Sequence, residues 1–118
     1  MLFRSTSVLA FNFTGSNKTF TQSAGTLTNN NINWKVNAGA SLSLVNNLPV
    51  ASSRTLTVDG TLTCGTLAVS GSGAVTVNSG GLLQLGSTSV SDAFAGNISA
   101  SGTKTLNTGS TEIGRAHV

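Results

Sequence analysis

The chain has 118 residues, which is enough for one domain. Gly, Ser, Thr and Asn make up 60 of these residues, only 8% are charged, and the formal net charge is +3. This composition excludes helical bundles and coiled coils, which need Ala, Leu, Glu and Lys in quantity, and a hydrophobic content of 38% argues against a disordered chain. An all-β chain rich in Thr, Val and Leu remains.

The basic character of the chain, with a pI near 9.8, does not indicate a nucleic-acid partner. A phosphate-binding surface needs clustered Lys and Arg side chains, whereas the six cations here are scattered, at Arg4, Lys18, Lys35, Arg54, Lys104 and Arg115. No stretch is long and apolar enough for a membrane-spanning helix, and the first residues lack the pattern of a secretory signal. We therefore expect neither nucleic-acid binding nor membrane insertion by this segment.

Residues 1–33 form the least regular part of the chain and are expected to make irregular N-terminal coils. Aromatic alternation occurs at Phe11-Asn12-Phe13, and Trp34 opens the first clear repeat. Trp34 is interpreted as a core residue or one that stacks at a coil end. The alternative is a platform on which a sugar ligand stacks.

A repeat occupies residues 34–112. An alternating strand ends in Val, a polar turn with Gly follows, and a second alternating strand begins, as in the segments 36–44, 58–64 and 77–85. The expected turn glycines recur every 20 to 22 residues, at Gly39, Gly60, Gly80 and Gly102. Strict alternation of apolar and polar residues predicts short half-buried strands between these turns.

This period predicts a single-stranded parallel β-helix, or β-solenoid, because two or three short strands per repeat match one coil. The length allows roughly five coils, a rod about 25 Å long at the usual strand spacing, and neither end shows a recognisable cap. The alternative is an antiparallel β-sandwich, which also has short, evenly spaced strands. A sandwich favours Asn-Gly or Asp-Gly hairpins, and only Asp59-Gly60 fits.

Candidate chemistry is sparse. The three acids Asp59, Asp92 and Glu112 fall in different coils, so no pair suits general acid/base catalysis. Asp59 takes the turn position that Asn37 and Asn78 take in the other repeats, which a turn-forming role explains. We therefore expect no catalytic residue, no cofactor-binding residue and no metal ligand, and the chain is predicted not to be an enzyme.

A lone cysteine and several threonine pairs are two further candidates for function. Cys64 continues the alternating run of Leu62 and is expected to be a small buried hydrophobe, because no local cation would activate its thiol. Thr-x-Thr pairs suggest ice binding as a third hypothesis. Their unequal spacing predicts that they do not stack into one face, since the pairs are Thr26/Thr28, Thr55/Thr57 and Thr61/Thr63.

The last residues, 113–118, break the composition abruptly. Ile-Gly-Arg-Ala-His-Val equals one reading frame of a widely used sequencing adapter, so this segment is interpreted as a translated adapter scar. On this hypothesis the chain is a fragment of a longer protein, and its one histidine, His117, is not native.

The repeats resemble those of large bacterial β-helical surface adhesins, of the filamentous-haemagglutinin and autotransporter-passenger kind. The resemblance is carried by the repeat at 36–44, Val-Ser-Gly-Ser-Gly-Ala-Val-Thr-Val at 69–77, Ser-Gly-Gly-Leu-Leu-Gln-Leu at 79–85 and the segment 96–106. It covers most of residues 34–112, on a degenerate motif of low complexity. It implies the β-helical fold and an exported protein, and it supplies no catalytic residues.

The expected function is therefore a non-catalytic structural or adhesive segment of a large exported bacterial surface protein, either a spacer rod or an adhesion surface. The resemblance implies an extracellular or cell-surface location, continuity with further repeats, and surface glycans or proteins of a host or environment as partners. The alternative is a carbohydrate-binding or carbohydrate-active β-helix whose site lies in missing coils.

Overall fold

The computed structural model describes residues 8–25, 31–86 and 96–113. Strands are short, three to five residues each, because turns interrupt every alternating run. The strands are β1 (Leu9–Phe13), β2 (Lys18–Phe20), β3 (Ile32–Val36), β4 (Ser41–Leu44), β5 (Leu48–Val50), β6 (Thr55–Val58), β7 (Thr61–Gly65), β8 (Val69–Gly71), β9 (Ala74–Val77), β10 (Leu82–Leu85), β11 (Lys104–Leu106) and β12 (Thr111–Ile113).

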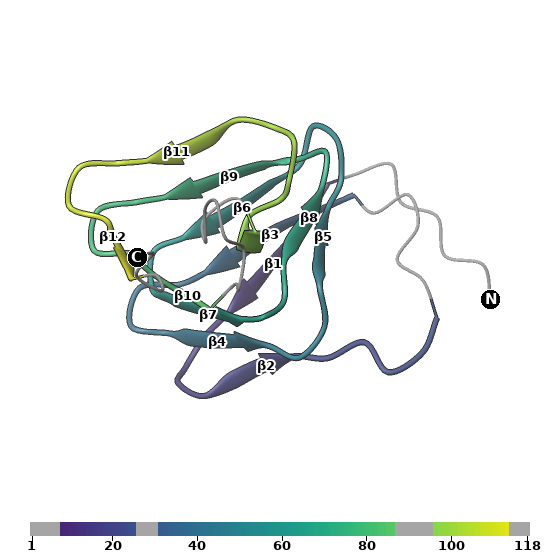
Figure 1. The fold of residues 1–118 in the computed structure, drawn as a ribbon, viewed down its shortest axis with the longest axis horizontal. Helices are drawn as coiled ribbons and strands as arrows, with labels where there is room; N and C mark the ends of the chain where they lie inside the picture. Colours follow the sequence, from purple (N-terminus) through teal and green to yellow (C-terminus); the bar gives the residue numbers. More distant parts are fainter. Residues whose placement is uncertain (1–7, 26–30, 87–95, 114–118) are drawn as a thin grey trace.

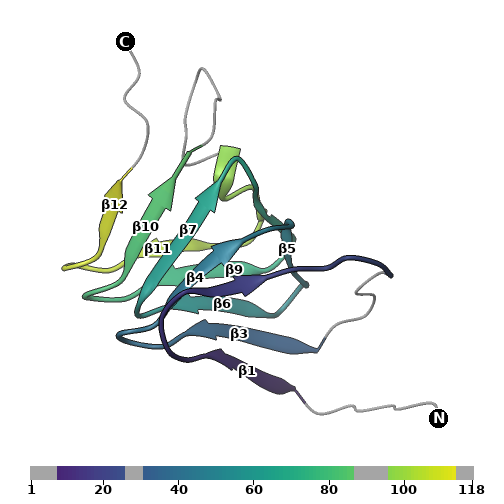
Figure 2. The ribbon, with the colours of Figure 1, turned by 90° about the horizontal axis from the view of Figure 1, so that it is seen from below.

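Every strand pair in the described residues is parallel. One sheet has the order β1-β3-β6-β9-β11, the second has the order β12-β10-β7-β4-β2, and β5 pairs with β8 on a third face. Figures 1 and 2 show the chain winding from one sheet to the next, with successive strands stacked along one axis. The predicted parallel β-solenoid is confirmed, and the antiparallel sandwich is excluded.

The solenoid has about three turns, and the expected number of five is wrong. Three turns reach the third face: β3-β4-β5, β6-β7-β8, and β9-β10 followed by a bridge from Ile98 to Val69. The first and last strand pairs, β1-β2 and β11-β12, add to two faces only. The expectation assumed an even period, but equivalent residues lie 19 apart at Asp59 and Asn78 and 29 apart at Asn78 and Asn107.

The core consists of apolar ladders that run along the axis. Each strand alternates, so every second side chain points inward and meets its equivalent in the next turn. On one sheet Trp34, Leu56 and Val75 form such a ladder, and on the other Leu42 pairs with Leu62 and then Leu83. All are at most 3% exposed. One turn cannot bury its own inward face, so neighbouring turns stabilise each other.

The stacking extends into residues 1–33. Phe11 pairs with Trp34 and Phe13 with Val36, so β1 continues the first sheet in register. At the other end, Thr111 pairs with Leu82. β12 ends at Ile113, and residues 114–118, most of the proposed adapter scar, lie outside the described residues.

Asparagine side chains complete the backbone hydrogen bonding at the corners. Asn33 Oδ1 accepts a hydrogen bond from the backbone N–H group of Thr55 in the neighbouring turn at 3.0 Å. In the same way, Asn46 Oδ1 accepts one from Gln22 at 2.6 Å, and Asn47 Oδ1 accepts one from Ala68 at 2.9 Å. Corner residues leave the strand ladder, and a buried N–H group without a partner is costly. The high Asn content therefore serves the contact between turns as well as the turns themselves.

The turn glycines have two distinct roles. Gly39 and Gly80 have positive φ, +78° and +85°, in the corner between the two five-stranded sheets, and Gly109 takes the equivalent place in the last turn. Gly60 is needed for close approach, because an added Cβ would lie 2.3 Å from Ala40 O and Asn37 O. Gly102 lies at another corner, before β11, and packs on Gly73.

Candidate functional site

Trp34, the residue proposed as a stacking platform, lies inside the solenoid. Its side chain is 3% exposed, and its indole Nε1–H donates a hydrogen bond to Pro49 O at 3.0 Å. Phe13 stacks on it with ring centroids 6.2 Å apart, Phe11 is tilted against it at 5.3 Å, and Phe20 meets it edge-on at 5.6 Å. Other rings therefore occupy the positions in which a sugar would stack.

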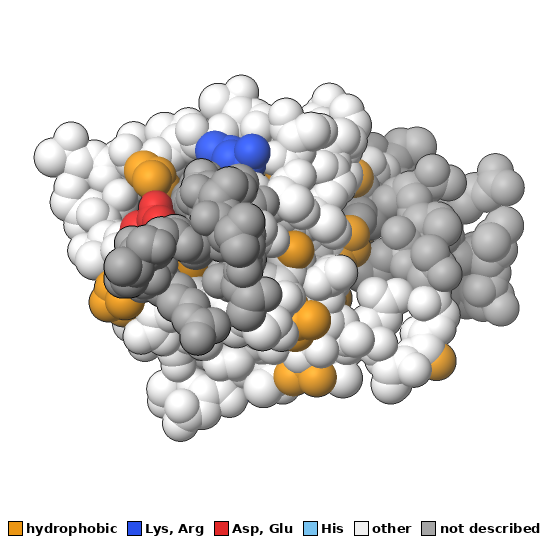
Figure 3. Space-filling view, in the orientation of Figure 1, with side chains coloured by type: hydrophobic (Ala, Val, Ile, Leu, Met, Phe, Trp, Pro, Cys, Tyr) orange, Lys and Arg blue, Asp and Glu red, His pale blue; other side chains and the backbone are white. Residues whose placement is uncertain are grey.

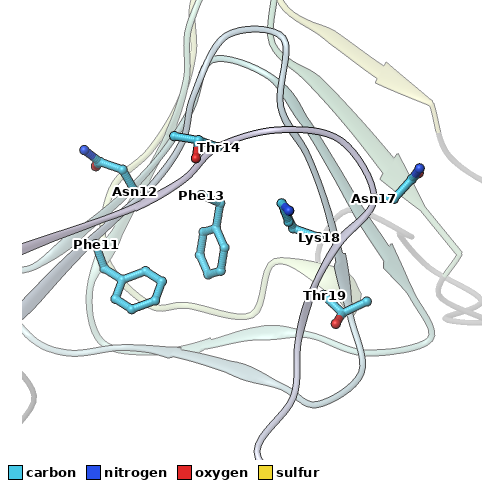
Figure 4. Close-up of a pocket in the computed structure, with 7 residues that line it drawn as sticks. All are labelled: Phe11, Asn12, Phe13, Thr14, Asn17, Lys18 and Thr19. Atoms are coloured by element: carbon cyan, nitrogen blue, oxygen red, sulfur yellow. The ribbon is translucent and has the colours of Figure 1, made fainter.

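These rings form an aromatic end of the solenoid. A pocket of about 360 Å³, lined by Phe11, Phe13, Phe20 and Trp34 among others, opens there beneath the first strands. A neighbouring recess of about 420 Å³ is drawn in Figure 4, where Phe11, Phe13 and Lys18 point into the space between the strands. Phe11, at 48%, is the most exposed aromatic side chain among the described residues.

The charged groups on the side of the rod are few. In Figure 3, red and blue side chains are sparse among polar atoms. The ion pair in the described residues joins Lys35 Nζ and Asp59 Oδ2 at 3.1 Å, with side chains 44% and 22% exposed. Asn78 Nδ2 donates to Asp59 Oδ1 at 2.7 Å, and Asn107 Nδ2 donates to Asn78 Oδ1 at 2.8 Å. This arrangement is a structural ladder at a corner.

Asp59 should make stability depend on pH. The hydrogen bond from Asn78, helped by Lys35 and opposed by desolvation, holds the pKa of Asp59 below its ordinary value of 3.8. A lowered folded-state pKa means that the stabilisation is complete well above pH 3.8 and is lost as the pH falls through the folded value. We expect the loss to be at most about 1 kcal/mol, because the pair is partly exposed.

The measurement is the free energy of unfolding in urea, determined at a series of pH values from neutral to acid. The unmodified protein is compared with the Asp59→Asn variant. The variant keeps an oxygen acceptor for Asn78 but cannot titrate. Its stability should fall less steeply in acid than that of the unmodified protein. Identical acid profiles would contradict a lowered pKa at Asp59.

Cys64 is fully buried, as the sequence predicted. Desolvation raises the pKa of its thiol to about 12, so the reactive thiolate is scarce at physiological pH. We expect no reaction with dithiodipyridine in the folded protein and rapid reaction in denaturant, followed by absorbance. Fast labelling of the folded protein would contradict the burial.

The two acids in the described residues, Asp59 and Glu112, lie in different turns. Asp59 lies in the corner between β6 and β7, Glu112 lies on β12, and Asp92 falls outside the described residues. Within 8–25, 31–86 and 96–113, no three metal-ligating side chains gather. The same residues contain no helix with the length and hydropathy needed to cross a membrane.

Threonines form a row that the sequence analysis missed. The Thr-x-Thr pairs Thr55/Thr57 and Thr61/Thr63 do not stack on one another, as expected, because they lie on β6 of the first sheet and β7 of the second, and Thr26/Thr28 lies outside the described residues. A row of single threonines does form on the outer face of the first sheet, where Thr57 pairs with Thr76 and Thr76 with Thr105. Thr55 lies beside Ala74 in a parallel row. Only Thr55 and Thr57 belong to a Thr-x-Thr pair considered from spacing, so pair spacing alone did not reveal the row.

The ends of the ladders carry charges, which sequence reasoning also missed. Lys18 pairs with Leu42, Lys104 with Val75, and Glu112 with Leu83, so each charge holds a position that is apolar in the adjoining turn. The alternating pattern of β11 and β12 contains this signal, but it can be seen only once the register is known.

Comparisons of the chain with protein-family models, curated proteins and solved structures found no match.

Proposed function

We propose that this chain is a non-catalytic structural segment of an exported bacterial surface protein, in which it acts as a spacer rod. The observation that supports the proposal is the repeated parallel stacking, with inward apolar ladders and outward rows of neutral polar side chains such as Ser43 and Thr63. Such a stack lengthens by adding turns and needs no other contact. The exported location is supported by the resemblance of residues 34–112 to surface adhesins.

The spacer role is tested by duplicating one turn. A second copy of residues 55–73 is inserted after Gly73, where Thr55 of the copy replaces Ala74 as the next register position. We expect the rod to lengthen by about 4.8 Å, one strand spacing, as measured by small-angle X-ray scattering. A scrambled insert of the same composition is the control, and it should loop out without lengthening the rod. No lengthening with the true repeat would refute the spacer role.

The adhesive version of the proposal predicts binding by the lateral faces. Beads coated with the chain are applied to mucin-coated and albumin-coated surfaces, and retention under flow is counted. A passive spacer gives equal retention on both surfaces. Preferential retention on mucin would assign adhesion to this segment.

Antibodies raised against residues 31–86 should label intact cells of the source organism if the protein is exported.

The alternative of carbohydrate binding is best tested at the aromatic end. Trp34 is unsuitable for this test because it is buried, so its replacement would damage the core. Phe11→Ala removes an exposed ring. A glycan-binding end predicts loss of binding in this variant on a glycan array, whereas a spacer predicts no binding by either protein.

A second candidate function, ice binding, is favoured by the threonine row alone. Thr57, Thr76 and Thr105 present hydroxyl and methyl groups at regular strand spacing on one sheet. Thermal hysteresis of the chain, lost in Thr76→Lys and kept in Thr63→Lys on the other sheet, would support it. Absence of hysteresis in the unmodified chain would exclude it.

A further inference from the structure

The Asp-Gly step of the sequence, Asp59-Gly60, forms an unusually short corner between the two large sheets. Residues 59 and 60 alone join β6 to β7, whereas residues 37–40 join β3 to β4 and residues 78–81 join β9 to β10. Asp-Gly steps are chemically labile, because glycine has no side chain to shield its backbone nitrogen from the preceding carboxyl group. A reactive step therefore lies at a tight corner in the middle of the rod.

The reaction open to this step is isomerisation through a succinimide. Gly60 N attacks Cγ of the protonated Asp59 carboxyl group, a C–N bond forms, and the amide proton leaves with the carboxyl hydroxyl group as water. Water then adds to one of the two ring carbonyl carbons and breaks its bond to the nitrogen. Cleavage at Cγ restores aspartate, whereas cleavage at the α-carbonyl carbon leaves the chain running through Cγ as isoaspartate. The chain keeps its mass, because the water that leaves is replaced by water from the solvent.

Contacts with the neighbouring turns engage both reacting groups. Asn78 Nδ2 donates to Asp59 Oδ1 at 2.7 Å, and Lys35 Nζ lies 3.1 Å from Asp59 Oδ2. Gly60 N–H donates to Val36 O at 3.1 Å, so the nitrogen that must attack keeps its proton. The hydrogen bond from Asn78, helped by Lys35, also holds the pKa of Asp59 below its ordinary value. The carboxylate therefore stays ionised, and in that form it is a poor electrophile.

We propose that Asp59-Gly60 is a self-modification site that the stacked rod keeps unreacted, and that isoaspartate forms there when the corner opens. Lys35 lies on β3 in the turn before, and Asn78 follows β9 in the turn after, so separation of either turn releases one carboxylate oxygen. Local opening of this kind occurs in native proteins without global unfolding. Isoaspartate at this position therefore records separation of the turns.

The corner has no room for the product. Isoaspartate adds one carbon atom to the backbone between β6 and β7, where Gly60 is already packed so closely that an added Cβ would lie 2.3 Å from Ala40 O. The next backbone group, Thr61 N–H, donates to Ala40 O at 2.9 Å at the start of β7. In Figure 2, β7 lies between β4 and β10. The modification should therefore weaken the middle of the second sheet.

The experiment incubates the full chain at neutral pH, in native buffer and in guanidinium chloride, and follows isoaspartate at position 59. Peptide mapping by mass spectrometry detects it as a peptide of unchanged mass and shifted retention, and an isoaspartyl methyltransferase labels it. We expect formation in the folded chain to be at least ~10-fold slower than in the unfolded chain, because only opened molecules react. Asp59→Glu should abolish the signal in both states, since its longer side chain closes the ring far more slowly.

Two variants test whether the neighbouring turns supply the protection. Asn78→Ala removes the hydrogen bond to Asp59 Oδ1 and should raise the rate in the folded chain about 5-fold. Lys35→Met removes the partly exposed ion pair and should raise it about 2-fold. The matched control is Asn107→Ala, which removes the bond from Asn107 Nδ2 to Asn78 Oδ1 and leaves both Asp59 contacts in place. Its rate should equal that of the unmodified chain.

Circular dichroism checks the fold of each variant. In guanidinium chloride every chain that keeps Asp59 should react at one common rate, which separates a lost contact from a change in intrinsic reactivity. Equal formation in the folded and unfolded chain, no formation in the unfolded chain, or equal rates for folded Asn78→Ala and Asn107→Ala would each overturn the proposal.

Discussion

Replacing Leu62 with alanine is expected to destabilise the protein by about 2–5 kcal/mol. Leu62 is fully buried at the centre of the ladder, with Leu42 on one side and Leu83 on the other. The loss is the sum of two costs: the transfer free energy of the removed side-chain atoms, and the cost of the cavity left between two fixed neighbours. Domains of this size have total stabilities of about 5–15 kcal/mol, so the change removes a large part of the total.

Urea unfolding followed by circular dichroism measures this effect, and Leu106→Ala provides the matched control. Leu106 is also an inward ladder residue, but it is 48% exposed at the last turn. Its truncation should cost less than about 1 kcal/mol, because about half of its surface already meets water. Equal losses in the two variants would contradict a core made of axial ladders.

Gly60→Ala is expected to cost about 3 kcal/mol through overpacking. The added methyl group would lie 2.3 Å from Ala40 O and Asn37 O, which belong to the preceding turn. Neither oxygen can move freely: Ala40 O accepts a hydrogen bond from Thr61 N at 2.9 Å, and Asn37 O accepts one from Ala40 N at 2.9 Å. Relief of the clash therefore requires the turns to separate locally.

The control for this prediction is Gly39→Asn, in the equivalent corner of the preceding turn. Gly39 has a φ of +78°, and an added Cβ would meet nothing within 4 Å. Asn adopts the left-handed region more readily than other residues with side chains, so we expect a loss below about 1 kcal/mol. Thermal unfolding midpoints of the two variants separate close packing from backbone conformation as the reason for glycine. A larger loss in Gly39→Asn would reverse the assignment.

The fold class could be predicted because alternation and period are local properties of the sequence. Val36, Val58 and Val77 each end an alternating run before a polar turn, and the structure places all three in one buried ladder. Trp34 was interpreted as a core residue or one that stacks at a coil end, and the structure buries it among other rings. The burial of Cys64 was predicted from alternation, because Cys64 continues the pattern of Leu62.

The register between turns could not be predicted from spacing, because stacking in space determines it. Gly102 keeps the period of 20 to 22 residues, yet Gly109 occupies the equivalent turn, since 29 residues separate Asn78 from Asn107. The same change of spacing hid the match of Thr105 with Thr76. It also hid the positions of the charges at the ladder ends, Lys104 and Glu112.

Parallel stacking along one axis has a mechanical consequence. The backbone hydrogen bonds between turns point along the rod, so a force that pulls the two chain ends apart loads them one turn after another instead of all together. A turn of roughly 20 residues that peels away adds about 70 Å of extended chain. Under tension such a rod would lengthen in steps, and each step would absorb energy before the next turn is loaded.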